Sequence, residues 1–243
     1  MNLTIDIGNT QTKLSVFNED KIIFSSVSKE LEQEIIINLK KKFPDINKVI
    51  LSSVKKNTLK RINYLAQNFK TFIELNPNTP LPIENLYLSG DTLGNDRIAA
   101  AAGASYLYPG SNILVIDAGT AITYDIVNDK KQYLGGNISP GLEMRFKALN
   151  QFTDKLPLVA KGELKKFPGR TTEDAIRAGV QQGVVFETDM TINRFKEIYK
   201  KLKVIITGGD ANFFDKKLKN SFFVNFNLTA FGLNCILEYN GET

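Results

Sequence analysis

The sequence predicts an α/β protein made of two similar domains with a cleft between them. One strand–turn–strand pattern occurs twice, as L-T-I-D-I-G-N-T-Q-T-K-L-S-V-F at 3–17 and as I-L-V-I-D-A-G-T-A-I-T-Y-D-I-V at 113–127. Two further strands match in the same order, 48–54 with 203–209 and 71–75 with 222–226. Chance could produce any single match because apolar strands look alike, but four in register indicate an internal repeat. Ligands favour the interface between such domains.

The first repeat is a β-hairpin whose turn suits a phosphate group. Gly8 lets the backbone approach closely, and Asp6 could hold a hydrated Mg²⁺. The side chains able to donate hydrogen bonds to phosphate or to add positive charge are Asn9, Thr10, Thr12 and Lys13. An ordinary hairpin with a Gly-Asn turn explains the same residues. The second copy favours the phosphate interpretation, because two Asp-x-Gly turns facing one cleft would hold a nucleotide's phosphates from both sides.

The remaining elements of the first half alternate between strands and helices. A third strand is predicted at 21–28, a helix at 30–42 that ends before Pro44, a buried parallel strand at 49–54 and an amphipathic helix at 58–69. The stretch N-P-N-T-P-L-P at 76–82 is typical of a loop. We therefore expect an N-terminal domain over 1–82 with the phosphate loop, and a C-terminal domain over 83–243 with the substrate loop, the cation site and a dimer helix.

The second half opens with a polar, Gly-rich segment at 83–96, followed by an Ala-rich helix at 97–107. Asp96 precedes this helix, where an Asp usually caps backbone amides. The adjacent Arg97 favours a second interpretation, in which Asp96 is a general base beside a carboxylate clamp for an acidic, hydroxyl-bearing substrate.

Glycines and hydroxyl residues mark the ends of the later elements. Gly135 to Gly141 (G-G-N-I-S-P-G) is predicted as a strand-to-helix turn between a strand ending near Tyr133 and a helix over 142–149, and its glycines would also let the backbone approach a ligand. Residues 151–170 are irregular, and a long helix runs from 171 to about 200. Thr172 is either its cap or a substrate contact. A last helix at 227–237 is expected to complete the second half.

Two groups of small residues in this half suggest close contacts. Ala178, Gly179 and Gly183 lie near the start of the long helix, where another backbone could approach. The T-G-G-D segment at 207–210 ends a buried strand, where α/β sheets place their ligands, and its Gly pair would suit the flat face of an adenine.

Composition excludes several classes of function. The chain has no histidine, so acid–base chemistry depends on carboxylates, and it has no G-x-x-x-x-G-K-[ST] motif of a Walker-type kinase. Its charge of +5 comes from lysines spread over helix-like segments without interleaved aromatics, so we expect no nucleic-acid partner. No apolar run approaches the roughly 20 residues of a membrane span. With one cysteine, Cys235, and no signal-peptide pattern, we expect a cytoplasmic protein.

Taken together, these motifs resemble type III pantothenate kinases, members of the acetate kinase, sugar kinase, Hsp70 and actin superfamily. The resemblance covers nearly the whole chain and rests on these segments: D-I-G-N-T-x-x-K at 6–13, G-N-D-R at 94–97, D-A-G-T-A at 117–121, G-G-x-I-x-P-G at 135–141, the helix that carries Thr172 and Gly179, T-G-G-D at 207–210 and N-L-x-x-x-G-L at 227–233. It implies a duplicated actin-like (ribonuclease H-like) fold and the ATP-dependent phosphorylation of pantothenate, the first step towards coenzyme A.

The resemblance also implies roles for individual residues. Asp96 would accept the proton and Asp117 would bind a monovalent cation such as K⁺ or NH₄⁺, while Mg²⁺ would bind near Asp6. The implied ATP contacts are Asp6, Ile7, Gly8, Asn9, Thr10, Gln11, Thr12, Lys13 and Thr120. The implied pantothenate contacts are Tyr87, Gly94, Asn95, Asp96, Arg97 and Thr172. Members of the family are typically homodimers with a shared pocket, and Gly90 here replaces a proline that often follows the tyrosine.

Three classes of function stay open on the sequence alone. They are a small-molecule kinase, a phosphohydrolase on the same fold and a non-catalytic ATP-sensing or regulatory module. Asp96 beside Arg97 favours the kinase, because a hydrolase would direct its base at water and would need no clamp for an acidic acceptor.

Overall fold

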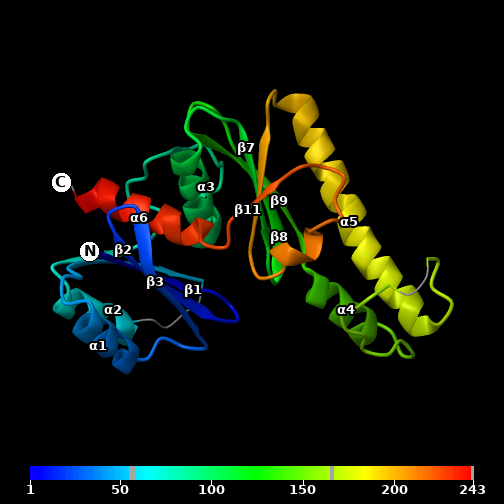
Figure 1. The fold of residues 1–243 in the computed structure, drawn as a ribbon, viewed down its shortest axis with the longest axis horizontal. Coiled ribbons are helices and arrows are strands. Elements are labelled where there is room, and N and C mark those ends of the chain that lie inside the picture. The colour runs from blue at the N-terminus through cyan, green and yellow to red at the C-terminus, as the bar shows by residue number, and fades with distance from the viewer. Residues whose placement is uncertain (55–58, 165–166, 242–243) are drawn as a thin grey trace. The chain divides into compact units, whose positions relative to one another are not determined.

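The computed structural model describes residues 1–54, 59–164 and 167–241, and these form two compact units (Figure 1). Unit 1 consists of Met1–Ser111, Val127–Gly135 and Asn227–Thr243. Unit 2 consists of Asn112–Ile126 and Gly136–Phe226. Within the described residues, no helix has the length and apolarity needed to cross a membrane.

A five-stranded sheet forms the centre of unit 1. Its strands, in the order β3-β2-β1-β4-β5, are β3 (Lys21–Ser28), β2 (Thr12–Asn18), β1 (Asn2–Ile7), β4 (Lys48–Ser53) and β5 (Thr71–Glu74). The hairpin β1–β2 is antiparallel, whereas β4 pairs in parallel with both β1 and β5. The predicted hairpin and the buried parallel strand are thereby confirmed.

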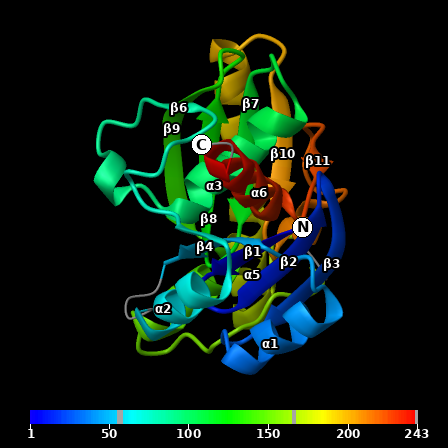
Figure 2. The same ribbon diagram turned by 90° about the vertical axis from the view of Figure 1, so that its left-hand side faces the viewer.

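Helices cover both faces of this sheet. On one face, Leu3, Ile5 and Ile7 pack with apolar residues of α1 (Gln33–Lys42) and α2 (Leu59–Asn68). On the other face, α3 (Asn95–Leu107) and α6 (Leu228–Gly241) pack with β4 and β5 (Figure 2). The predicted start of the second helix, Thr58, lies outside the described residues. Because strand side chains alternate, Asp6 faces α3 and α6 rather than α1 and α2.

The second sheet has the same topology. Its strands, in the order β11-β10-β7-β8-β9-β6, are β11 (Phe223–Val224), β10 (Lys203–Thr207), β7 (Ile113–Ala118), β8 (Ala121–Val127), β9 (Gln132–Pro140) and β6 (Glu84–Asn85). Read from β9 to β11, this order repeats the order from β3 to β5, with β6 added at the edge. The central strands β7 and β10 are again parallel. The internal repeat predicted from the sequence is therefore present in the fold.

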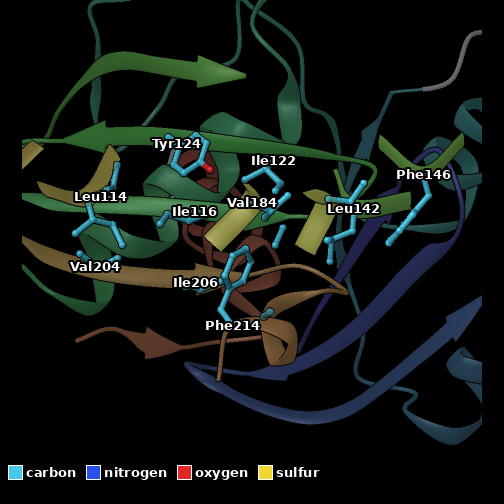
Figure 3. Close-up of a cluster of buried hydrophobic side chains, with 14 of the residues drawn as sticks. Leu114, Ile116, Ile122, Tyr124, Leu142, Phe146, Val184, Val204, Ile206 and Phe214 are labelled. Atoms are coloured by element: carbon cyan, nitrogen blue, oxygen red, sulfur yellow. The ribbon is translucent and has the colours of Figure 1, made fainter. Parts of the chain in front are cut away.

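The core of unit 2 lies between its strands and two helices, α4 (Leu142–Gln151) and α5 (Thr172–Ile198). Figure 3 shows Leu114 of β7 beside Val204 of β10, with Phe214 beneath Ile206. Phe214 comes from a short 3₁₀ segment, η2 (Ala211–Phe214), which follows β10; a second one, η1 (Gly90–Thr92), precedes α3. These residues are almost completely buried, so the end of β7 is anchored in a close-packed interior.

The structure corrects two predictions about elements. The last helix does not complete the second half: α6 belongs to unit 1, because it packs with Ile50 of β4 and because Asn2 of β1 donates through Nδ2 to Asn234 Oδ1 at 2.8 Å. The compact units therefore differ from the predicted division at residue 82. In addition, β9 does not end near Tyr133 but continues to Pro140, so that Gly135 and Gly136 lie within the strand.

Glycines allow α3 and α6 to approach closely. A Cβ on Gly232 would collide with the Ala99 carbonyl oxygen, and a Cβ on Gly103 would collide with the Leu228 carbonyl oxygen. The two helix backbones are thus in direct contact, which positions the start of α3 against the sheet of unit 1.

We expect Gly232→Ala to lower the free energy of unfolding by roughly 1–3 kcal/mol, because the added methyl group forces two packed backbones apart. Chemical denaturation followed by circular dichroism measures the change. Gly90→Ala in the same unit is the matched control, since its Cβ would meet only the Asn85 side chain at 3.7 Å. Equal stability of the two variants would contradict the close helix contact.

Candidate functional site

The first turn joins the end of β1, one residue after Asp6, to the start of β2. The Gly8 amide donates to the Gln11 carbonyl at 3.0 Å, and this bond closes a tight turn. Asn9 and Thr10 are exposed at its tip, while Ile7 lies in the core and Gln11 is half-buried. The turn therefore presents short polar side chains and backbone groups, which are the groups that bind phosphate oxygens.

Asp6 lies at the centre of a small polar cluster in unit 1. It pairs in register with Lys13 on β2 and with Ser52 on β4, and the Ser52 hydroxyl donates to Asp6 Oδ1 at 3.1 Å. Burial raises the pKa of Asp6 to about 6, and the negative charge of Asp96 adds to this rise. Ser52 and Lys13 act in the opposite direction. Two carboxylates of unit 1 thus affect each other's charge at the end of β1.

This cluster fits a divalent cation in the chemistry of its donors. Mg²⁺ in nucleotide sites binds through one or two carboxylates and completes its coordination with water and phosphate oxygens. A buried carboxylate that is further disfavoured by a neighbouring negative charge gains from such an ion. Asp6 is the residue of the cluster that would hold it.

Thr12 occupies a different position from the rest of the turn. It pairs in register with Ile7 and is fully buried, on the face of β2 opposite to Lys13. Among the residues that the structure describes, its hydroxyl has no hydrogen-bond partner. In this structure the Thr12 hydroxyl therefore does not reach the surface of the turn, in contrast to Asn9 and Thr10.

The start of α3 presents the G-N-D-R segment. The N-cap residue is Gly94, so Asp96 lies inside the first turn and its Oδ1 accepts from the Arg97 amide at 2.9 Å. Asn95 donates through Nδ2 to the Leu75 carbonyl at 2.8 Å, which ties the helix start to the end of β5. A Cβ on Gly94 would lie 2.5 Å from Asp96 Oδ1, so glycine leaves room for the carboxylate.

Arg97 and Tyr87 form a stacked pair beside this segment. The Arg97 guanidinium carbon lies 5.5 Å from the centre of the Tyr87 ring, and only 7% of Arg97 is exposed. The ring packs over Gly135, where a Cβ would lie 3.1 Å from Tyr87 Cδ2, and it lies 6.0 Å from the Tyr133 ring. These contacts hold Tyr87 in place although Gly90 replaces the proline expected after it.

Asp117 and Thr120 lie at the equivalent turn of unit 2. Gly208 adopts a φ of +92°, and a Cβ there would collide with Asp117 Oδ1 and the Ala118 carbonyl oxygen. The Asp210 amide donates to that same Ala118 carbonyl at 2.9 Å, so the T-G-G-D segment follows the end of β7 closely. This turn offers the Asp117 carboxylate and the Ala118 carbonyl oxygen next to Gly208, which has no side chain. Hard cations prefer oxygen ligands of this kind.

The backbone of the Thr120 turn is fixed by Gly141. The Gly141 amide donates to the Thr120 carbonyl at 3.1 Å, and a Cβ on Gly141 would lie 2.5 Å from that oxygen. The Thr120 side chain is exposed. Of the G-G-N-I-S-P-G segment, Gly141 alone forms the turn into α4, and its role is to support Thr120.

Thr172 is not the cap of α5. The capping hydroxyl belongs to Thr171, which accepts from the Asp174 amide at 3.1 Å. Thr172 is exposed at the edge of a cavity of about 830 Å³ between α4 and α5. Arg145 lines the same cavity and is held by Glu187 at 2.6 Å and by Ser139 at 2.6 Å. The Thr171 hydroxyl is engaged as the helix cap, whereas the Thr172 hydroxyl does not cap the helix and is exposed to a ligand.

Unit 1 therefore brings together Asp6, the turn that follows it, Lys13 and Asp96, with Tyr87 and Arg97 packed together beside Asp96. Unit 2 holds Asp117 and Thr120 on one turn, whereas Thr172 lines a cavity that neither of them lines. Reasoning from the sequence missed Ser52 and Arg145. Ser52 ends a buried strand of the first repeat, at the place that Thr207 has in the second, and that match could have indicated it.

Comparisons with known proteins point to one family. A family model described as type III pantothenate kinase matches residues 2–194. Two similar relatives carry the same name: one from Christiangramia forsetii is 44% identical over 99% of both chains, and one from Phocaeicola vulgatus is 44% identical over 100% of both chains.

Solved structures agree with the fold. A protein from Campylobacter jejuni, described as belonging to the Baf family of transcriptional activators, is 25% identical with a TM-score of 0.64 and covers 99% of this chain and 100% of its own. A glucokinase from an Antarctic psychrotroph is 13% identical with a TM-score of 0.55 over 98% of each chain. The second likeness supports the duplicated sugar-kinase and actin-like fold alone.

Proposed function

The chain belongs to the type III pantothenate kinase family, and from this membership we propose how its residues carry out the reaction. The protein is an ATP-dependent kinase that phosphorylates pantothenate in the biosynthesis of coenzyme A. The observation that carries our assignment is the position of Asp96 in the first turn of α3, where its Oδ1 accepts from the Arg97 amide and its negative charge raises the pKa of Asp6. No observation favours a phosphohydrolase or an ATP sensor, and the cytoplasmic location stays a prediction.

Asp96 is the general base in this proposal. The primary hydroxyl oxygen of pantothenate attacks the γ-phosphorus of ATP, the bond from that phosphorus to the β,γ-bridging oxygen breaks, and ADP leaves. The hydroxyl proton passes to the Asp96 carboxylate. Because the chain contains no histidine, a carboxylate is the available type of base. The first turn of α3 supports Asp96 in this role, since Gly94 leaves the carboxylate free of steric crowding.

The residues around Asp96 would bind pantothenate. Arg97 would receive its carboxylate, supported by the Tyr87 ring against which the guanidinium is stacked. Gly94 and Asn95 would contribute backbone and amide groups beside the hydroxyl. Thr172, which is exposed on α5, is a further proposed contact of pantothenate.

ATP would bind through Asp6 to Lys13 and Thr120. In this set, Asn9, Thr10 and Lys13 have side chains suited to phosphate oxygens, whereas the buried Thr12 would act through its place in the strand. Bound Mg²⁺ near Asp6 would offset the charge of the phosphate oxygens. Asp117 would hold a monovalent cation, K⁺ or NH₄⁺, beside the glycine backbone at 208.

Replacing Asp96 by Asn should reduce kcat by roughly 10²- to 10⁴-fold, because the amide cannot accept the proton. ATP affinity should stay nearly unchanged, since Asp96 is not among the proposed ATP contacts. A coupled assay for ADP gives kcat, and calorimetric titration gives ATP affinity.

Arg97→Lys is the control for this variant. It keeps the positive charge but loses the planar fork, so KM for pantothenate should rise with little change in kcat. A loss in kcat of less than about fivefold for Asp96→Asn would remove Asp96 from the role of base.

Turnover should depend on a monovalent cation through Asp117. In wild-type protein, exchange of K⁺ for Na⁺ should reduce kcat/KM, and Asp117→Asn should abolish the difference between the two salts. Asp210→Asn is the matched control, because this carboxylate near the same turn is already paired with Lys161 at 2.6 Å. Full activity in sodium-only buffer would contradict the assignment.

Self-association through α5 is the proposed basis of a homodimer. At Gly179 and Gly183 an added Cβ would meet nothing within 4 Å, and Phe186 and Met190 continue the same face with 56% and 65% exposure. Ala178, which the sequence placed on this face, is instead buried within unit 2. Exposed apolar side chains at this spacing favour burial against a second helix.

We expect light scattering to give twice the chain mass of 27.2 kDa for the wild type, and the mass of one chain for Phe186→Arg at micromolar concentration. A charge at the centre of an apolar contact has no partner there. Ile37→Arg, on an exposed apolar residue of α1, should leave the dimer intact. A wild-type monomer at every concentration would refute the proposal.

A further inference from the structure

Ser52 lies where its hydroxyl can control the orientation of Asp6. It is the fifth residue of β4, paired in parallel register with Asp6 of β1, and it is fully buried. Its Oγ donates to Asp6 Oδ1 at 3.1 Å. Because Ser52 is shielded from solvent by the surrounding unit, it would not touch a substrate itself. Any effect on the reaction has to pass through Asp6.

The Ser52 hydroxyl bonds to Oδ1 of Asp6 and not to Oδ2. Because this bond restricts the rotation of the carboxylate, it also sets the direction in which Oδ2 points. A carboxylate on a strand end can otherwise rotate about χ2, whose preferences are broad. Partners in the outer shell of a metal ligand typically change metal affinity by 10- to 100-fold when they are lost.

The same strand register recurs in the second repeat. Thr207 ends β10, pairs in parallel register with Asp117 of β7 and is 2% exposed. Both repeats thus place a buried hydroxyl residue on the parallel strand beside the carboxylate that ends the central strand. If Ser52 only filled space in the first sheet, there would be no reason to expect a buried hydroxyl at the equivalent position of the second sheet.

We propose that Ser52 is a positioning residue that holds the Asp6 carboxylate in the orientation for binding the divalent cation of the Mg·ATP complex. The proposal rests on the assignment of Asp6 as the residue that binds this ion. It concerns affinity for the ion and not the proton transfer assigned to Asp96.

The test compares Ser52→Ala, Ser52→Thr and Ser15→Ala in the full-length protein. Ser15 is the matched control: it is a 4% exposed serine of the same sheet, but its Oγ lies 3.0 Å from another hydroxyl oxygen, Ser25 Oγ. Bound Mn²⁺ is measured by electron paramagnetic resonance in the presence of a non-hydrolysable ATP analogue, so that the readout does not depend on turnover. The Mg²⁺ concentration for half-maximal rate and the urea midpoint of unfolding are measured alongside.

We expect Ser52→Ala to weaken Mn²⁺ binding about 10-fold and to raise the half-saturating Mg²⁺ concentration by a similar factor. At saturating Mg²⁺, kcat should be nearly that of the wild type. Ser52→Thr should restore the affinity, because it keeps the hydroxyl. Ser15→Ala should bind Mn²⁺ like the wild type, even if its urea midpoint falls as far as that of Ser52→Ala.

A fourth variant, Asp6→Asn, separates this proposal from the assignment on which it depends. If Asp6→Asn binds Mn²⁺ as tightly as the wild type, then Asp6 does not bind the ion. If Asp6→Asn loses the ion while Ser52→Ala keeps wild-type affinity, then Asp6 binds the ion without help from Ser52 and the present proposal is wrong. Equal weakening in Ser52→Ala and Ser15→Ala would also overturn it, since the effect would then follow from lost stability.

Discussion

A half-buried carboxylate at the end of the central strand, Asp6, is the constraint on which the site of unit 1 depends. Burial favours the protonated form of Asp6, so the surrounding residues have to supply compensating interactions. In unit 1 these come from Ser52 and Lys13 on the two neighbouring strands. The parallel pairing of β1 and β4 is therefore a requirement of the site as well as of the sheet, because it sets the hydroxyl beside the carboxylate.

Close helix packing then brings the second carboxylate into range. Asp96 lies in the first turn of α3, and α3 is held against α6 by contact between backbones at Gly103 and Gly232. Asn95 ties the same turn to the end of β5. The glycines far along α3 and in the C-terminal helix thus contribute to the geometry at the helix start, although neither glycine has a side chain that could take part in chemistry.

The two repeats share a topology but have diverged in their use of equivalent positions. In the first hairpin Lys13 faces Asp6, whereas in the second hairpin Tyr124 packs with Ile116 and Ala118 on the face of the sheet opposite to Asp117. Its hydroxyl lies 3.0 Å from Thr188 Oγ1 and donates to Glu187 at 3.2 Å. Burial raises the pKa of Tyr124 to about 12, so this group remains a neutral hydrogen-bonding partner. The first unit keeps charge near its turn, whereas in the second unit Tyr124 binds β8 to α5. The two turns thus share a backbone topology but carry different side chains.

The sequence by itself determined both hairpins, the parallel strands and the positions of Asp6, Asp96 and Asp117, because apolar periodicity and Gly-containing turns are local properties. Tertiary structure alone decided which elements meet. The return of α6 to unit 1 depends on its fit to α3, and the Tyr87 ring that packs over Gly135 leaves little room for a side chain there. Likewise, Thr12 is turned away from the surface by cross-strand register with Ile7, and Ser52 is joined to Asp6 across 46 residues of sequence. Contacts between residues far apart in the chain leave no periodic signal, so only the folded chain reveals them.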